Sequence, residues 1–217
     1  MRSQKRLGGV MSYRMYGKAI PKELYSEKDQ YFCKDIVRLK VGEVFLDGGA
    51  YTGDTIQQFM DICKKEKVIY KKVIAFEPDK NNFALLSKFY GRRDKVLIYN
   101  KGLSKEKDVL YFQESGVASK LSAQGLCKVP VINIDFIPEC KEVTFIKMDI
   151  EGAEMDALLG AQETIKRNHP KLAICIYHSD EDMVRIVEYI HALVPEYKLF
   201  IRHHSERHVE TVVYAVE

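Results

Sequence analysis

The sequence lacks the features that would mark a secreted or membrane-bound protein. No apolar run is long enough to cross a bilayer, and no charged start leads into an apolar stretch. The five cysteines show no C-x-x-C spacing, and an odd number without a pattern argues against both a disulfide framework and a zinc site. We therefore expect reduced thiols in a cytoplasmic protein without membrane insertion.

The sequence also has little excess of either charge, since its formal net charge is +3. The imbalance is local, because residues 1–18 contain five basic residues and no acidic one. A basic arm can bind nucleic acid, but no RNA-binding module or basic-aromatic motif accompanies it. We predict that residues 1–26 form a basic, poorly ordered N-terminal arm, that residues 27–217 form a single domain, and that nucleic acid is not a partner.

The glycine fingerprint of dinucleotide-binding proteins is missing as well, although a related loop is present. The apolar segment 44–46 runs into Asp-Gly-Gly-Ala-Tyr-Thr-Gly-Asp at residues 47–54. Ala50 stands where a second glycine would let the backbone approach a pyrophosphate. Asp47 would repel a pyrophosphate and attract a cation. The loop therefore favours S-adenosyl-L-methionine, which has a ribose, an ammonium and a sulfonium but no phosphate.

A second acidic residue supports this interpretation. The apolar segment 73–76 ends in Glu77-Pro78-Asp79, and Glu77 follows Asp47 by 30 positions. That separation fits one strand, one crossover helix and one strand, so Glu77 can reach a ribose diol with two charge-assisted hydrogen bonds. The candidate cofactor contacts in these two segments are Asp47, Gly49, Ala50, Thr52, Glu77 and Pro78.

Apolar segments with strand and helix periods alternate along the chain, which is typical of an α/β fold. We expect a mostly parallel seven-stranded sheet, a terminal antiparallel hairpin and a small β insertion. The predicted strands are 44–46, 73–76, 96–100, 143–147, 172–177, 197–201 and 211–215, with 109–113 and 129–134 in the insertion. The predicted helices are 27–39, 54–65, 81–90, 153–168 and 180–193.

Polar residues end several of these predicted strands. They are Asp47, Glu77, Asn100, Asp149 and His178. Ligands of parallel sheets bind beyond the carboxyl ends of the strands, so these side chains are expected at one crevice. Asn100 is expected on the adenine or ribose side, and Ser119, in the insertion, is expected to reach the same region.

His178 is the candidate general base for a hydroxyl acceptor, because an imidazole titrates near physiological pH. The alternative is a histidine that pairs only with the main chain. Asp149 can orient this imidazole or contact the substrate or the methionine part of the cofactor. Arg202 and His203 end the first strand of the hairpin and are candidates to bind an acidic or hydroxylated substrate.

Three acidic residues, Asp149, Glu151 and Glu154, raise the question of a metal. Carboxylate oxygens suit Mg²⁺ or Ca²⁺. However, Glu151 and Glu154 begin a predicted helix, where acidic side chains cap free N–H groups and complement the dipole. We therefore predict no metal.

The sequence resembles the FkbM family of S-adenosylmethionine-dependent methyltransferases from about Asp29 to the C-terminus. The resemblance rests on residues 29–32, 47–50, 76–78, 100–104, 177–178 and, most specifically, the run Lys-Met-Asp-Ile-Glu-Gly-Ala-Glu at 147–154. It implies a Rossmann-like class I fold, and it implies that Glu151 and Glu154 shape the acceptor site. The family pattern most often has asparagine at position 51, where this chain has tyrosine.

The expected function is S-adenosylmethionine-dependent O-methylation of a hydroxyl on a small acceptor, such as a saccharide or secondary metabolite. Two alternatives remain open at this point. One is an NAD-dependent oxidoreductase on a similar sheet, and the other is a module that binds the cofactor without catalysis.

Overall fold

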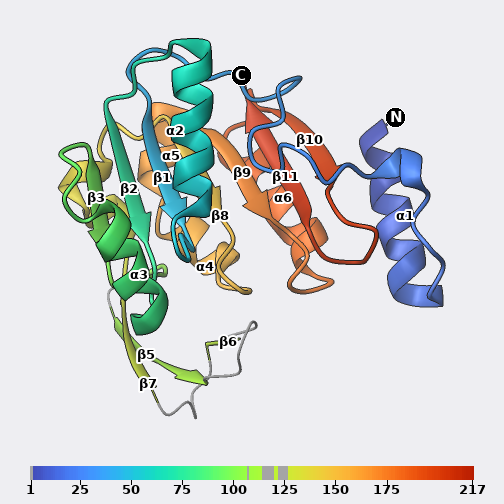
Figure 1. Ribbon diagram of the computed structural model, residues 1–217. Coiled ribbons are helices and arrows are strands. Elements are labelled where there is room, and N and C mark those ends of the chain that lie inside the picture. The colour runs from blue at the N-terminus through green and yellow to red at the C-terminus, as the bar shows by residue number, and fades with distance from the viewer. Residues whose placement is uncertain (1, 107, 114–119, 122–126) are drawn as a thin grey trace. The chain divides into compact units, whose positions relative to one another are not determined.

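The computed structural model describes residues 2–106, 108–113, 120–121 and 127–217 (Figure 1). Seven strands form a mainly parallel sheet in the order β10-β11-β9-β8-β1-β2-β3, and the insertion forms a four-stranded sheet in the order β4-β7-β5-β6. The predicted fold class is confirmed. The chain divides into two compact units, residues 39–170 and residues 1–38 with 171–217.

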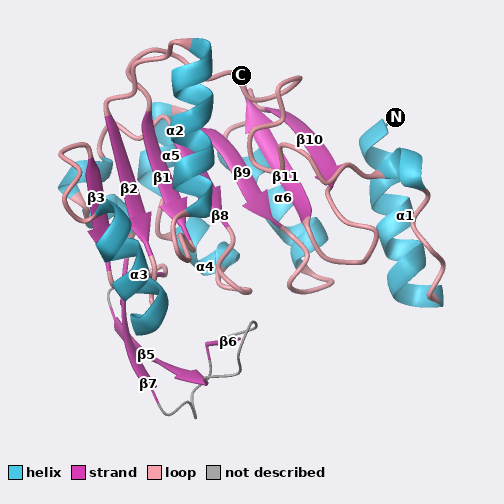
Figure 2. Ribbon diagram, in the orientation of Figure 1, coloured by secondary structure: helices cyan, strands magenta, loops and turns pink. Residues whose placement is uncertain are grey.

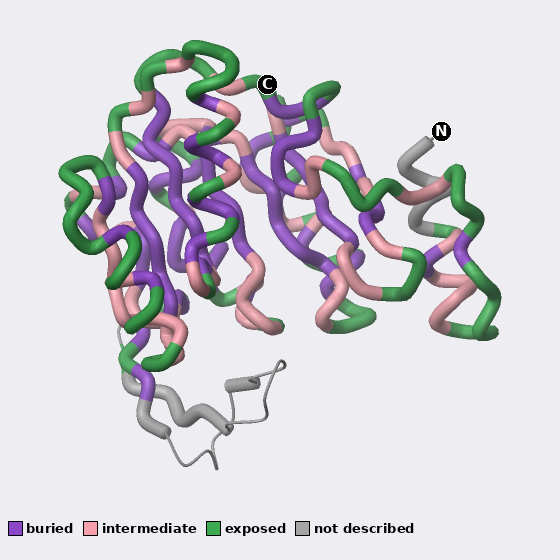
Figure 3. Tube along the Cα trace, viewed as in Figure 1, coloured by how far each residue is buried: buried purple, intermediate pink, exposed green. Residues whose placement is uncertain are grey.

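The unit of residues 39–170 is built around four parallel strands: β1 (Val44–Gly48), β2 (Lys72–Phe76), β3 (Val96–Tyr99) and β8 (Phe145–Met148). Strand β1 pairs in parallel with β2 on one side and with β8 on the other. Every residue of β1 and β8 is buried, as the tube in Figure 3 shows. Mostly apolar segments form such strands because both faces of a parallel sheet are covered, and each of these two strands contains one charged residue.

The helices of this unit are α2 (Asp54–Glu66), α3 (Lys80–Tyr90), α4 (Glu154–Leu159) and α5 (Gln162–Asn168). Figure 2 shows α2 in front of the parallel strands and α5 behind them. The α2 side chain Phe59 stacks on Phe45 of β1, with 4.7 Å between the ring centroids. This contact packs the middle of α2 against the first half of β1.

The structure corrects the single helix predicted over 153–168, which is two helices. Gly160 separates them, and its carbonyl accepts a hydrogen bond from the Asp135 N–H at 3.0 Å. The Asp135 carboxylate then accepts from the N–H groups of Glu163 and Thr164 at 3.0 and 2.8 Å. In a continuous helix these two N–H groups would donate to carbonyl oxygens of the preceding turn. Here they donate to the Asp135 side chain, which therefore caps the start of a new helix.

The insertion contains β4 (Gly102–Leu103), β5 (Asp108–Gln113), β6 (Lys120–Leu121) and β7 (Cys127–Ile132), followed by the short 3₁₀ helices η2 (Ile134–Phe136) and η3 (Pro138–Cys140). The two predicted strands correspond to β5 and β7, which pair antiparallel. Sequence reasoning missed β4 and β6, because a two-residue strand has no detectable period.

The other unit contains α1 (Arg2–Tyr16), η1 (Lys22–Leu24), β9 (Lys171–Cys175), α6 (Asp182–Leu193), β10 (Lys198–His203) and β11 (Thr211–Val216). Strand β11 is antiparallel to both β10 and β9, so the expected terminal hairpin is confirmed. Within this unit, Val10 of α1 is fully buried in a cluster with Ile20 and Met183. No helix in the described part of the chain is long and apolar enough to cross a membrane.

The helix predicted over 27–39 is wrong. This segment consists of bends and isolated turns, such as the hydrogen bond from the Ile36 N–H to the Cys33 carbonyl. Asp29 adopts a φ of 55°, which a right-handed helix excludes. Tyr31 and Phe32 are both buried, consistent with a core role.

Candidate functional site

The loop between β1 and α2, residues 49–53, has an unusual backbone. Gly49, Tyr51 and Gly53 have φ angles of 73°, 49° and 95°. A Cβ on Gly49 would lie 1.9 Å from the carbonyl oxygen of Asp149, so only glycine fits there. Gly49 therefore serves the close packing of this loop against the end of β8, in addition to its turn.

The end of β2 holds the N–H side of this loop. The Phe76 carbonyl accepts hydrogen bonds from the N–H groups of Gly49 and Ala50, each at 3.0 Å. The Tyr51 N–H donates to Oε2 of Glu77 at 2.8 Å. These three N–H groups are therefore used to join the β1–α2 loop to the end of β2.

Glu77 occupies the predicted position at the carboxyl end of β2. Its Oε1 accepts from the Asp79 N–H at 2.8 Å, and its side chain is buried. Burial raises the pKa of Glu77 to about 7, although the two N–H donors oppose this shift. A carboxylate oxygen can accept more than one hydrogen bond, so the same group can also receive hydroxyl donors.

Asn100 and Pro78 lie beside Glu77. The Asn100 amide donates to the carbonyl oxygens of Glu77 and Pro78 at 2.9 and 3.1 Å. Asn100 therefore fixes the segment that carries the Glu77 carboxylate. Thr52 is half-buried within the β1–α2 loop. Ser119, the remaining predicted cofactor contact from the insertion, lies outside the described residues.

The carboxylate of Asp47 lies next to a cationic side chain of the protein itself, that of Lys147. Asp47 of β1 is directly opposite Lys147 of β8, and Oδ1 lies 3.0 Å from the lysine Nζ. Neither carboxylate oxygen has an aligned hydrogen-bond donor among the described residues, so the contact is an ion pair. Burial raises the pKa of Asp47 to about 6, and the nearby ammonium opposes this shift.

Sequence reasoning gave Lys147 no role. The signal was present, because a lysine in the apolar segment 145–148 must find an anionic or polar partner inside the protein. What the sequence could not supply was the register that brings it opposite Asp47.

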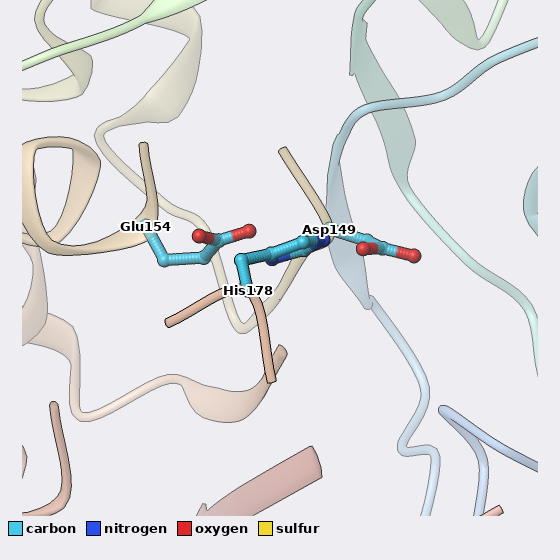
Figure 4. Close-up of side chains that lie close together, drawn as sticks. All are labelled: Asp149, Glu154 and His178. Carbon is cyan, nitrogen blue, oxygen red and sulfur yellow. The ribbon is translucent and has the colours of Figure 1, made fainter. Parts of the chain in front are cut away.

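Glu154 is fully buried at the start of α4, where its two oxygens accept from the N–H groups of Ile150 and Gly152 at 2.7 and 3.0 Å. It thus holds the turn that contains Glu151, whose φ is 57°. Asp149 is half-buried, and a carboxylate oxygen of Asp149 lies within 4.8 Å of one of Glu154 (Figure 4). Figure 4 also labels His178, which belongs to the other unit.

In the unit that contains β9, His178 follows the strand in the segment 177–180. The Tyr177 and His178 ring centroids lie 4.1 Å apart. Arg14 of α1 pairs with the Asp180 carboxylate and donates to the Tyr177 carbonyl, so it bonds to both ends of the segment that carries His178. Sequence reasoning missed Arg14, because it lies in the basic N-terminal segment far from any motif.

Arg202 and His203 end β10 in this unit. Arg202 is paired with Asp35 at 2.8 Å. The His203 imidazole is buried, its Nδ1 lies 2.9 Å from Oγ1 of Thr211, and burial lowers its pKa. Both side chains thus have partners within the protein, and a role in substrate binding stays a prediction for each.

The fold is that of the Rossmann-like methyltransferases. Fibrillarin from Aeropyrum pernix with bound S-adenosyl-L-methionine is similar at a TM-score of 0.53 and 12% identity, over 88% of this chain and 74% of that one. An rRNA methylase from Streptococcus thermophilus gives a TM-score of 0.52 and 14% identity, over 82% of this chain and 88% of that one. At these identities the likeness concerns the fold.

Residues 47–204 match the methyltransferase FkbM domain, and the chain belongs to this family. The crystal structure of methyltransferase FkbM from Methylobacillus flagellatus KT is similar at a TM-score of 0.79 and 26% identity. The match covers 99% of this chain and 55% of that one, so the chain spans about half the length of this relative. The search of curated protein sequences found no match.

Proposed function

We propose that this protein transfers a methyl group from S-adenosyl-L-methionine to a hydroxyl of a small acceptor, such as a saccharide or secondary metabolite. The observation that supports it best is the Glu77 carboxylate at the end of β2, hydrogen-bonded to the β1–α2 loop at 2.8 Å. An acidic residue at this point suits a ribose diol, which donates two hydrogen bonds.

In this proposal, Glu77 binds the ribose and Asn100 keeps its segment in place. Gly49, Ala50 and Thr52 form the surface beside the methionine part, while Pro78 borders the adenine. Asp47 acts indirectly, because its carboxylate is fully buried against Lys147. The bound cofactor supplies a methyl group that its sulfonium activates, so the protein needs only to orient and deprotonate the acceptor.

His178 is the proposed base. Its imidazole would accept the hydroxyl proton of the acceptor, while the bound cofactor would supply the methyl group to the acceptor oxygen and leave as S-adenosylhomocysteine. Asp149 orients the imidazole or contacts the acceptor. Glu154 and Glu151 shape the acceptor site through the turn at 150–152, and Arg202 and His203 are proposed to bind acidic or hydroxylated groups of the acceptor.

Calorimetric titration with S-adenosylhomocysteine and, separately, with NAD tests the cofactor. Binding of S-adenosylhomocysteine alone is expected. Binding of NAD alone would refute the proposal and favour an oxidoreductase. Incubation with methyl-labelled S-adenosylmethionine and a panel of saccharides and other hydroxylated compounds then tests the acceptor, and an O-methyl product is expected. Label on nitrogen, sulfur or carbon only would contradict O-methylation.

A further inference from the structure

Lys147 is a buried cation with several contacts to the β1–α2 loop. Its side chain is 3% exposed, and its Nζ donates to the carbonyl oxygens of Gly48 and Gly49 at 3.1 and 2.8 Å. The third neighbour is the Asp47 carboxylate at 3.0 Å. Lysine is rarely buried this deeply, so these oxygen contacts are consistent with a specific structural task.

The same two peptide groups are also held from the opposite side. The Gly48 carbonyl and the Gly49 N–H belong to one peptide plane, and the Gly49 carbonyl and the Ala50 N–H belong to the next. Both carbonyls bond to Lys147, while both N–H groups bond to the Phe76 carbonyl. Each plane is therefore held from both sides. The Gly48 carbonyl also accepts a hydrogen bond from the Asp149 N–H at 3.1 Å, so the Gly49 plane is the one that depends most on Lys147.

The orientation of these two peptide planes influences the direction of the Tyr51 N–H group. Directly after them, Tyr51 takes a φ of 49°, and its N–H points at Oε2 of Glu77 at a distance of 2.8 Å. A left-handed conformation is unfavourable for tyrosine, so the flanking contacts must hold it. If the planes rotate, the Tyr51 N–H loses its alignment with the carboxylate assigned to the ribose.

We propose that Lys147 is a positioning residue that fixes the cofactor-binding conformation of the β1–α2 loop through the carbonyl groups of Gly48 and Gly49. The inference rests on the proposed function in one respect, namely that this loop contacts the cofactor. The competing role is simpler: Lys147 would only neutralise the buried charge of Asp47 and would have no influence on ligand binding.

Two variants separate these roles. Lys147→Met removes the N–H donors but leaves the Asp47 carboxylate buried without its cation, which is strongly destabilising. The double variant Lys147→Met with Asp47→Asn removes both charges, so it is expected to recover much of the lost stability. Lys198→Met is the matched control, because Lys198 is an exposed lysine in β10 of the other unit.

Two measurements are made below the unfolding temperature of each variant. Calorimetry with S-adenosylhomocysteine is expected to show affinity lower by about tenfold to a hundredfold in the double variant, the size of effect expected when a hydrogen bond to a charged group is lost. Hydrogen exchange of the Gly49, Ala50 and Tyr51 amides, without ligand, is expected to be faster than in the wild type. The control should match the wild type in both.

The positioning role is refuted if the double variant binds S-adenosylhomocysteine as tightly as the wild type, because charge neutralisation would then explain the pair. Unchanged amide exchange in the ligand-free double variant would refute it as well. A wild type that does not bind S-adenosylhomocysteine would contradict the proposed cofactor, and the exchange measurement would still decide whether Lys147 holds the loop.

Discussion

Asp47 and Lys147 face each other across β1 and β8, and their charged groups lie 3.0 Å apart in the interior. Asp47, near the end of β1, was expected to attract the positive charge of the cofactor. Instead its carboxylate is fully buried and has a lysine as counter-ion. The Asp47 carboxylate is thus neutralised within the protein, and the proposed contact with the cofactor depends chiefly on Glu77.

Glu77→Gln is expected to weaken S-adenosylhomocysteine binding by about 2–3 kcal/mol, the cost of losing charged hydrogen bonds in a buried place. Calorimetry measures this change. Glu66→Gln serves as the control, since Glu66 is exposed at the end of α2. Equal affinities for the wild type and Glu77→Gln would remove Glu77 from the binding site.

The affinity for S-adenosylhomocysteine is expected to rise between pH 6 and pH 8. Burial raises the pKa of Glu77 to about 7, and the carboxylate proposed to accept the ribose hydroxyls forms as the pH passes this value. Calorimetric titrations across this range should show the rise in the wild type and a flatter profile in Glu77→Gln. The same slope in both proteins would assign the pH dependence to another group.

The free energy of unfolding is expected to fall as the pH rises, which is opposite to the trend of the ligand affinity. Because the folded-state pKa of Glu77 is raised from 4.5 to about 7, the folded protein binds more protons than the unfolded chain within this window. The contribution to stability is complete below pH 4.5 and is lost as the pH rises through 7. Urea titrations of the ligand-free protein should therefore show a steeper decline for the wild type than for Glu77→Gln over this range.

His178→Ala is expected to leave S-adenosylhomocysteine affinity unchanged and to slow methyl transfer to the best hydroxylated acceptor by about 10² to 10⁴-fold, as for loss of a general base. The rate is measured with methyl-labelled cofactor. His191→Ala is a suitable comparison, because His191 is an exposed histidine of α6. Full activity of His178→Ala would transfer the role of base to Asp149.

Arg14→Ala is expected to lower the free energy of unfolding by about 1–2 kcal/mol, because the hydrogen bonds to the Tyr177 carbonyl and the Asp180 carboxylate are lost. Amide exchange in residues 177–181 should also accelerate. Arg185→Ala provides the contrast, since its ion pair with Glu181 is exposed and should contribute little. Equal effects of the two substitutions would show that Arg14 does not hold this segment.

Removal of divalent ions with EDTA is expected to leave both S-adenosylhomocysteine binding and methyl transfer unchanged. The physical reason is that the Glu154 carboxylate is already engaged by the N–H groups of Ile150 and Gly152. The transfer rate before and after chelation is the measurement. Activity that disappears with EDTA and returns with Mg²⁺ would instead show that a metal is required.

The sequence by itself determined the class of fold and the order of its main elements. Buried parallel strands need continuous apolar runs, and each crossover helix needs an apolar face, so these patterns are local and legible. The Glu77 position was predictable for the same reason, because it follows directly from where β2 ends. The helix predicted over 27–39 was wrong, because Asp29 in this segment takes a positive φ that a right-handed helix excludes.

The tertiary structure decided which polar groups meet. Strand register places Lys147 opposite Asp47, a distant carboxylate at Asp135 splits one predicted helix into two, and packing against Asp149 makes glycine necessary at position 49. These contacts join residues that are 28 to 100 positions apart in the sequence. Such pairings depend on how whole strands and helices align, and no local pattern of residues contains that information.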